Sequence, residues 1–191
     1  LVQGLDETTD LVPGRYEGGF KVWECSVDLC EHLARDPSGE GQGDSTGSSP
    51  PSSRPCLRGK RVLELGCGQG LPGILCLLLG ASEVVFQDYN REVLTCVTRP
   101  CVQRNLLQKQ QEEQQQKQEE EEREAAVRYI SGDWAGCKAL LGEGSFDLIL
   151  TAETIYEPKS VPTLLDLLAW CLHPEKGVAL VATKVYYFGV G

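Results

Sequence analysis

The chain has 191 residues, a length that suits a single domain with a core of ordinary size. Its composition, 41% hydrophobic and 24% charged, is typical of a globular protein and excludes a collagen-like or wholly disordered chain. The net charge of −10 argues against a protein that holds nucleic acid over its whole surface, because phosphate contacts need clustered lysines and arginines. The same negative charge is compatible with basic proteins as partners.

The nine cysteines include no CxxC pair and are accompanied by only two histidines, so we expect no metal site. We interpret them as reduced thiols of a cytoplasmic and nuclear protein, and we expect a monomer. No apolar run approaches the roughly 18 residues needed to span a bilayer, and no signal peptide begins the chain, so we expect no membrane contact. The chain lacks Met and begins at Leu1, which suggests a piece of a longer protein.

Two stretches of biased composition divide the chain. Residues 36–56 are rich in Gly, Ser and Pro, and we interpret them as a flexible loop after an N-terminal segment of residues 1–35. Residues 57–191 form the main domain, which carries a Gln- and Glu-rich insert at 108–124. Because the insert contains helix formers but no apolar face, it is a solvated helical extension or a disordered segment, with an acidic functional arm as a further alternative.

Short apolar runs alternate with helical patterns along the rest of the chain. The pattern predicts strands at 61–65, 83–87, 127–130, 146–151 and 177–183, and helices at 71–79, 91–107 and 161–172. Pro100 is expected to kink the second of these helices or to break it in two. The alternation indicates a doubly wound α/β fold, a mainly parallel Rossmann-like sheet with helices on both faces. Its ligand site should lie at the carboxyl ends of the strands.

A glycine-rich turn follows the first predicted strand. Gly66, Gly68 and Gly70 let the backbone approach a ligand closely, and the next helix offers free N–H groups. Residues 68–73 also match the GxGxxG pattern of dinucleotide sites, but that frame leaves Glu64 unexplained. An acidic residue two positions before Gly66 suits S-adenosylmethionine, which carries a sulfonium and an ammonium group but no phosphate. The motif therefore favours this cofactor over a dinucleotide, and a purely structural turn is the remaining alternative.

Polar residues end the second predicted strand. Asp88 lies where a carboxylate accepts hydrogen bonds from both hydroxyls of a ribose. Gln87 and Tyr89 belong to the same turn, and Tyr89 is placed to pack against an adenine ring. The alternative for Asp88 is an Asx turn or a helix cap, and we assign the capping role to Asn90 instead.

Further candidates follow the third and fourth predicted strands. Gly132 permits close approach, Asp133 is able to accept the adenine amino group, and Trp134 is a flat ring that core packing explains equally well. After the fourth strand, the small Ala152 leaves room for the cofactor, and residues 153–156 come nearest to the transferred methyl group. Here Glu153 and Tyr156 are the candidates for chemistry. Lys184, Tyr186 and Tyr187 follow the fifth strand on the same edge, as site or rim residues.

With these motifs in place, the chain resembles the seven-stranded S-adenosylmethionine-dependent methyltransferases, in the group with an acid-x-x-Tyr motif after strand four. Within that group it is most similar to the protein-histidine N-methyltransferases that modify a large-subunit ribosomal protein. The similarity rests on residues 11–25, 86–90, 132–134, 151–156 and 187–191. It implies methyl transfer to a histidine side-chain nitrogen of a protein, and a large-subunit ribosomal protein as the substrate.

The resemblance also implies site residues that the pattern alone does not. It places Val22, Trp23, Glu24, Cys25 and Ser26 in the cofactor pocket, where periodicity by itself predicts an amphipathic helix with Trp23 in the core. Family members continue past the segment that ends this chain. We therefore expect the chain to supply about five of seven strands and to leave an exposed sheet edge.

Glu153 and Tyr156 are the residues we nominate for the chemistry. A histidine nucleophile is largely neutral at pH 7, so the enzyme mainly has to align it and to bind its other ring N–H. We nominate Glu153 for that contact and Tyr156 as a second positioning group, and a cofactor-binding or structural role for Glu153 is the alternative. Three other functions stay open: a protein-lysine methyltransferase of the same group, an inactive cofactor-binding or interaction module, and an NAD-dependent oxidoreductase.

Overall fold

The computed structural model describes residues 12, 15–35, 57–116 and 125–186. Its centre is a five-stranded parallel sheet in the order β3-β2-β1-β4-β5. The strands are β1 (Arg61–Leu65), β2 (Glu83–Asp88), β3 (Ala126–Ser131), β4 (Leu148–Ala152) and β5 (Val178–Ala182). The α/β class predicted from the sequence is confirmed. The strand order reverses between β1 and β4, which is where a doubly wound sheet opens a crevice at its carboxyl edge.

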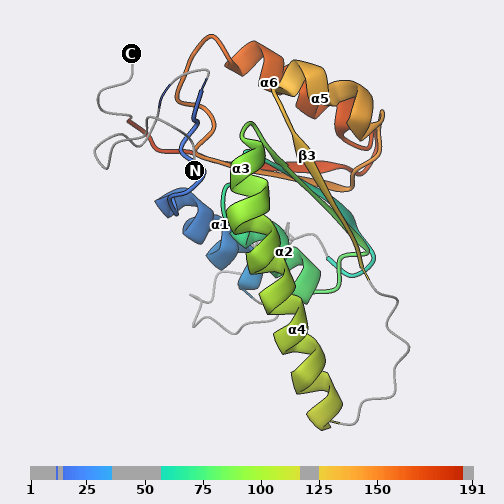
Figure 1. Cartoon of the computed structure of the whole chain (residues 1–191). Coiled ribbons are helices and arrows are strands. Elements are labelled where there is room, and N and C mark those ends of the chain that lie inside the picture. The colour runs from blue at the N-terminus through green and yellow to red at the C-terminus, as the bar shows by residue number, and fades with distance from the viewer. Residues whose placement is uncertain (1–11, 13–14, 36–56, 117–124, 187–191) are drawn as a thin grey trace, which may run out of the picture.

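Helices cover both faces of the sheet (Figure 1). One face is covered by α1 (Glu24–Ala34), α2 (Leu71–Leu78) and the run that starts at α3 (Arg91–Val93) and continues into α4 (Arg99–Gln116). The other face is covered by α5 (Trp134–Leu141) and α6 (Val161–Cys171). The result is the doubly wound arrangement that the alternating pattern predicts.

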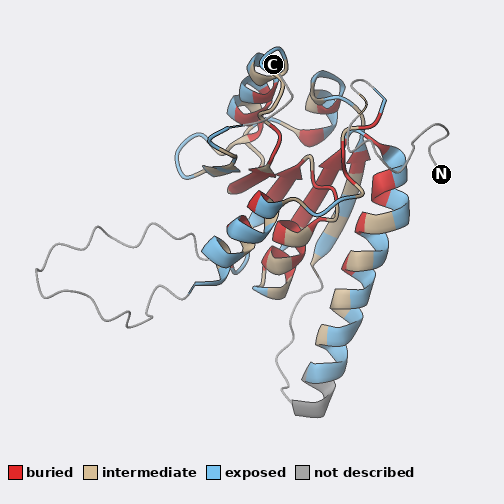
Figure 2. Ribbon diagram, turned by 90° about the vertical axis from the view of Figure 1, so that its left-hand side faces the viewer, coloured by how far each residue is buried: buried red, intermediate tan, exposed pale blue. Residues whose placement is uncertain are grey.

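The hydrophobic core lies on both faces of the sheet because successive strand residues point to opposite sides. In β1, Val62 packs with the α2 face and Leu63 with the α5 and α6 face. Val84 and Val85 divide in the same way in β2. All four are fully buried, and Figure 2 shows the buried strands at the centre of the molecule. A strand buried on both faces is mostly apolar, which is why these short runs could be recognised in the sequence.

The predicted strand boundaries differ little from the observed ones, with one instructive exception, whereas α5 was not predicted and α4 continues past the predicted end at residue 107 to Gln116. The run at 146–151 was expected to be a strand from its first residue, but β4 begins at Leu148. Phe146 instead forms an isolated bridge with Leu172, at the end of α6. Phe146 is fully buried all the same. In the sequence, a buried apolar residue just before a strand cannot be told apart from the strand itself, which is why the predicted strand began at Phe146.

The helix around Pro100 passes the proline rather than breaking. A π-helical turn, Leu94–Thr98, lies between α3 and α4, and the Arg99 N–H donates to the Leu94 carbonyl five residues earlier. Proline has no N–H to donate, so one backbone hydrogen bond of the helix is missing. The helix accommodates this by changing locally from bonds four residues apart to bonds five residues apart. The expected interruption is thus a π turn, in which the Thr98 hydroxyl donates to the Gly68 carbonyl at 2.6 Å.

The Gln- and Glu-rich insert is helical where the structure describes it. Helix α4 continues into the insert and ends at Gln116, while residues 117–124 lie outside the described residues. The helix extends beyond the sheet (Figure 1), and its residues from Leu107 to Glu112 are mostly exposed (Figure 2). Residues 36–56, predicted to be a flexible loop, also lie outside the described residues.

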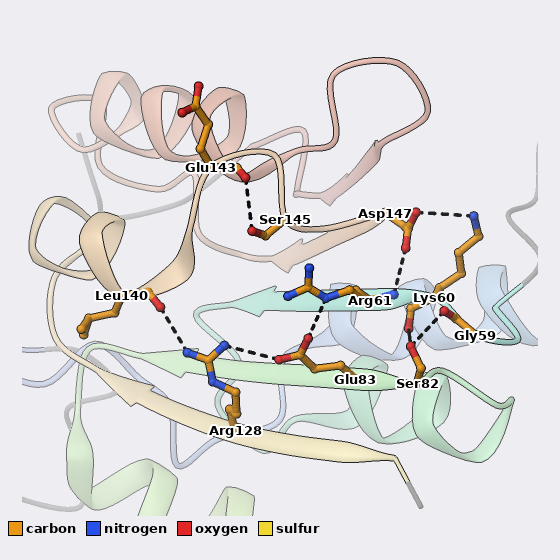
Figure 3. Close-up of polar contacts among 10 residues, drawn as sticks. All are labelled: Gly59, Lys60, Arg61, Ser82, Glu83, Arg128, Leu140, Glu143, Ser145 and Asp147. Atoms are coloured by element: carbon orange, nitrogen blue, oxygen red, sulfur yellow. Dashed lines mark hydrogen bonds and ion pairs between the residues drawn. The ribbon is translucent and has the colours of Figure 1, made fainter. Parts of the chain in front are cut away.

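Charged side chains form a network at the amino edge of the sheet (Figure 3). Glu83 on β2 pairs with Arg61 on β1 at 2.7 Å and with Arg128 on β3 at 3.3 Å. Asp147, just before β4, accepts the Arg61 backbone N–H and lies 3.7 Å from the Lys60 ammonium group. The paired arginines outweigh the effect of burial and lower the pKa of Glu83. These charges hold neighbouring strands together at the edge opposite the predicted ligand site.

Three further properties can be stated for the described part of the chain. No helix there is both long and apolar enough to cross a bilayer. No group of His, Cys, Asp and Glu there is arranged to hold a metal ion. The cysteines described there are free thiols, among them Cys25, Cys67, Cys76, Cys137 and Cys171 in the interior.

Candidate functional site

A cavity of about 680 Å³ lies at the carboxyl edge of the sheet. Its walls come from the glycine turn after β1, from the turns after β2 and β3, and from the loop after β4. A fifth wall is a segment that precedes α1, residues 15–23, which we call the N-terminal strap. The volume falls within the range of small-molecule sites in proteins. The predicted edge therefore does hold a cavity.

The glycine turn gives the cavity a wall of bare backbone. Gly66, Gly68 and Gly70 all have positive φ angles, of 61°, 50° and 75°. A Cβ atom on Gly66 would lie 2.6 Å from the Thr154 side chain, and one on Gly68 would lie 3.2 Å from the Gly19 carbonyl oxygen. All three glycines line the cavity. Side chains are thus excluded here by both conformation and space, and the backbone faces a ligand directly.

Glu64 does not line the cavity, which corrects its predicted place in the cofactor site. It points from β1 toward α2, on the same side as Val62, and only 4% of it is exposed. Its Oε2 accepts the Gly73 N–H at 2.8 Å, within the first turns of α2. Burial raises the pKa of Glu64 from 4.5 to about 8. The alternation of side chains along β1 therefore turns this carboxylate away from the ligand and onto the helix.

Asp88 lines the cavity at the end of β2, as predicted. Its Oδ2 accepts the Gly68 N–H at 3.0 Å and its Oδ1 accepts the Asn90 N–H at 2.9 Å. Burial raises its pKa, against the lowering effect of these two hydrogen bonds. Asp88 therefore forms the Asx turn and still faces the cavity. Both roles are possible because each carboxylate oxygen can accept more than one hydrogen bond.

Asn90 is not a helix cap, and this prediction was wrong. It stands at the N-cap position of α3 but makes no side-chain capping bond. Its Oδ1 instead accepts the Glu17 N–H at 3.1 Å, and its Nδ2 donates to the Arg15 carbonyl at 2.8 Å. These bonds tie the N-terminal strap to the turn that carries Asp88. A partner more than 70 residues away competes successfully with the local cap.

Gln87 connects three walls without lining the cavity itself. Its Oε1 accepts the Gly66 N–H at 3.2 Å and the Trp134 ring N–H at 3.1 Å. Its Nε2 donates to the Gly132 carbonyl at 2.8 Å. The side chain is 1% exposed. Gln87 therefore fixes the turns after β1 and β3 relative to each other, and its predicted role in the cofactor site is indirect.

The turn after β3 faces the cavity. Gly132, Asp133 and Trp134 line it, together with Tyr89 from the neighbouring turn. Asp133 also caps α5, since its Oδ1 accepts the Gly136 N–H at 2.6 Å. Trp134 packs against the core on the α5 and α6 face while part of its ring borders the cavity. Trp134 therefore packs in the core and also borders the cavity, and its contact with a cofactor stays a prediction.

The residues before and within α1 divide into two groups. Val22, Trp23 and Ser26 line the cavity, whereas Glu24 and Cys25 do not. Glu24 is largely exposed and pairs with Lys184 at 3.3 Å. Cys25 is buried behind the wall, where burial and the neighbouring Glu153 raise its pKa to about 12. The resemblance thus names the correct segment, but only some of its side chains border the cavity.

Glu153 is the most unusual residue of the site. It lines the cavity with a φ angle of 58°, a conformation that non-glycine residues rarely adopt. Its side chain is 3% exposed and lies 3.6 Å from the Lys184 ammonium group. Oε1 accepts the Cys25 N–H at 3.4 Å, but Oε2 is buried and has no hydrogen-bond partner in the described part of the chain. A buried carboxylate oxygen without a donor is costly, which points to a donor supplied by a ligand.

Tyr156 and Ala152 also line the cavity. The Tyr156 hydroxyl donates a hydrogen bond to the Glu17 carboxylate. Glu17 lines the cavity and was missed by the sequence analysis. No spacing rule could have found it, because its partner lies 139 residues further along the chain.

Negative charge dominates the cavity walls. Carboxylates line it from the N-terminal strap, the turns after β2 and β3 and the loop after β4, contributed by Glu17, Asp88, Asp133, Glu153 and Glu157. Lys21 is the cation among the lining residues. A pyrophosphate would meet repulsion in such a site, whereas a cationic ligand is attracted. The structure therefore favours a cationic ligand without phosphate over a dinucleotide.

Comparison with known proteins agrees with this arrangement. A family profile described as "Lysine methyltransferase" matches residues 13–187. The chain belongs to this methyltransferase family. The histidine protein methyltransferase 1 homolog of Dictyostelium discoideum is 42% identical over 98% of this chain and 50% of its own length. The Rattus norvegicus homolog is 39% identical over 99% of this chain and 51% of its own length.

A solved S-adenosylmethionine-dependent methyltransferase from Mesorhizobium loti aligns with a TM-score of 0.49 and 22% identity, over 68% of this chain and 49% of that one. The family resemblance predicted from the motifs is confirmed by the profile and the relatives. This methyltransferase chain spans about half the length of the curated relatives it matches.

Proposed function

We propose that the protein transfers a methyl group from S-adenosylmethionine to a side-chain nitrogen of histidine in another protein. The names of the two relatives support histidine as the acceptor, and the description of the family profile names lysine as the alternative. The observation that carries the proposal is Glu153, a buried glutamate that lines an acidic cavity at the carboxyl edge of the sheet and whose Oε2 has no hydrogen-bond partner among the described residues.

The residues of the cavity fit S-adenosylmethionine. The cofactor has two cationic groups and no phosphate, which suits walls lined by carboxylates. The bare backbone at Gly66 and Gly68 would hold its amino-acid part, and Asp88 would hold the ribose hydroxyls. Asp133 and Trp134 would contact the adenine. When bound, the cofactor supplies an electrophilic methyl group.

The acceptor side of the cavity suits a neutral imidazole. Histidine has an ordinary pKa near 6.5, so at pH 7 one ring nitrogen carries a free lone pair and the other carries a hydrogen. Glu153 Oε2 is free to accept that N–H, which fixes the ring and its tautomer. Methylation makes the ring cationic, and the adjacent carboxylate stabilises this charge. No strong base is required, whereas a lysine would first have to lose a proton.

For the substrate we propose a basic protein, specifically a large-subunit ribosomal protein. The net charge of −10 supports a basic partner, since opposite charges speed up encounter and favour the complex. We further propose that the protein acts as a monomer in the cytoplasm and nucleus, where such substrates are made and assembled, without direct reading of nucleic acid.

Replacement of Asp88 tests the cofactor site. We expect Asp88→Asn to weaken S-adenosylmethionine binding by roughly 10- to 100-fold, because it removes a charged hydrogen-bond acceptor facing the cavity. Isothermal titration calorimetry with S-adenosylmethionine measures the dissociation constant. Asp166→Asn is the matched control, since Asp166 lies on the exposed surface of α6 and pairs with Lys138. Equal affinity of the Asp88 variant and the control would remove Asp88 from the site.

A further inference from the structure

The hydrogen bond between Tyr156 and Glu17 joins two parts of the chain across the cavity. Tyr156 belongs to the loop after β4, and Glu17 belongs to the N-terminal strap. Both side chains are half-buried and both line the cavity. The sequence predicts for Tyr156 only a general positioning role, and Glu17 has no role in the proposed function. In the bond between them, the Tyr156 hydroxyl is the donor and the Glu17 carboxylate is the acceptor, and this direction suggests a more specific role for both.

Glu17 is held in place by its backbone. Its N–H donates to Asn90 Oδ1 at 3.1 Å, and the same amide side chain donates from Nδ2 to the Arg15 carbonyl at 2.8 Å. Asn90 is itself buried and follows the turn that carries Asp88. The Glu17 carboxylate is therefore fixed relative to the predicted ribose site, and its contact with Tyr156 does not depend on a freely moving surface residue.

The Tyr156 hydroxyl has one proton, and that proton is directed at Glu17. A phenol can donate one hydrogen bond, so while this bond persists the remaining capacity of the oxygen is to accept. Burial, together with Glu17, raises the pKa of Tyr156, which keeps the phenol protonated. Glu153 Oε2 is also an acceptor, so neither Glu153 nor Tyr156 offers a proton to the acceptor histidine.

We propose that Glu17 is a positioning residue that keeps the Tyr156 proton away from the attacking nitrogen of the acceptor histidine. This inference rests on the proposed function. The attacking nitrogen forms the new N–CH₃ bond with its lone pair, and the electrons of the broken C–S bond remain on sulfur. A hydroxyl that donated to that lone pair would stabilise the ground state and slow the attack. Glu17 prevents this by accepting the proton itself.

The inference predicts an unusual pattern in a set of variants. Glu17→Ala releases the Tyr156 proton, and we expect turnover to fall about 10-fold or more while KM for the protein substrate does not rise. Glu17→Gln retains an acceptor for the hydroxyl and should keep more turnover than Glu17→Ala. The double variant Glu17→Ala/Tyr156→Phe removes the misdirected donor, and we expect it to turn over at least about 3-fold faster than Glu17→Ala alone.

Methyl transfer from labelled S-adenosylmethionine to large-subunit ribosomal proteins provides kcat and KM, and calorimetry with S-adenosylmethionine confirms that each variant still folds and binds. A structural role for Glu17 would make the double variant no better than Glu17→Ala, and that result would overturn the inference. A wild-type protein that places no methyl group on histidine would instead contradict the proposed function, and the inference with it. Restored turnover in the double variant supports the inference.

Discussion

Replacing Glu153 with Gln is expected to lower turnover by about 100-fold or more while the affinity for S-adenosylmethionine stays nearly unchanged. The substitution keeps the size of the side chain and removes its charge. In the protein, Oε2 of Glu153 is buried beside the cavity without a donor, and Oε1 holds the Cys25 N–H. A glutamine would orient the ring less well and would no longer stabilise the cationic product.

Steady-state kinetics with a ribosomal protein substrate, together with calorimetry for the cofactor, separate the two roles that the sequence left open for Glu153. Lost turnover with intact cofactor affinity assigns it to the acceptor. Lost affinity would assign it to the cofactor, and unchanged turnover would remove it from the chemistry. Glu143→Gln is a suitable control, because Glu143 is an exposed glutamate in the loop before β4.

Replacing Glu64 with Gln is expected to stabilise the protein at pH 8. Burial raises the pKa of Glu64 from 4.5 to about 8 in the folded state, so folding disfavours the charged form. Below pH 4.5 the carboxyl is protonated in both states and folding carries no penalty. As the pH rises toward 8 the unfolded chain ionises first, so the wild-type protein loses stability relative to the variant, on the order of 3 kcal/mol.

Urea unfolding of wild-type protein and variant between pH 5 and pH 9 measures this effect. The glutamine carbonyl can still accept the Gly73 N–H, so the α2 contact is retained. The difference in unfolding free energy should grow in favour of the variant as pH increases. A constant difference across the range would show that Glu64 does not change its ionisation on folding. Glu175→Gln, at an exposed glutamate, provides the baseline.

The fold was predictable from the sequence because its signals are local. A strand buried on both faces is mostly apolar, and β1 and β2 were recognised by the apolar residues at their centres. The glycine turn and Asp88 were found because they follow such strands, and parallel strands bring their carboxyl ends to one edge. Pro100 correctly predicted an irregular helix. Its form, a π turn and not a break, could not be predicted because it depends on the residues that pack around the helix.

The site was predicted less completely because several of its contacts join distant segments. Glu64 fits the motif, yet its direction is set by the alternation of side chains in β1 and by the nearby N–H groups of α2. Asn90 has the residue type of a cap but bonds to the N-terminal strap. Glu17 has no local signature at all, since its role exists only where the strap meets the loop after β4.

The central claim, methyl transfer to a histidine side chain, is tested most directly by one measurement. The protein is incubated with isotopically labelled S-adenosylmethionine and purified large-subunit ribosomal proteins, and the labelled residue is identified by mass spectrometry of the digested products. We expect the label on a ring nitrogen of a histidine in one of these proteins. Label found on lysine alone, or no label on any ribosomal protein, would contradict the claim.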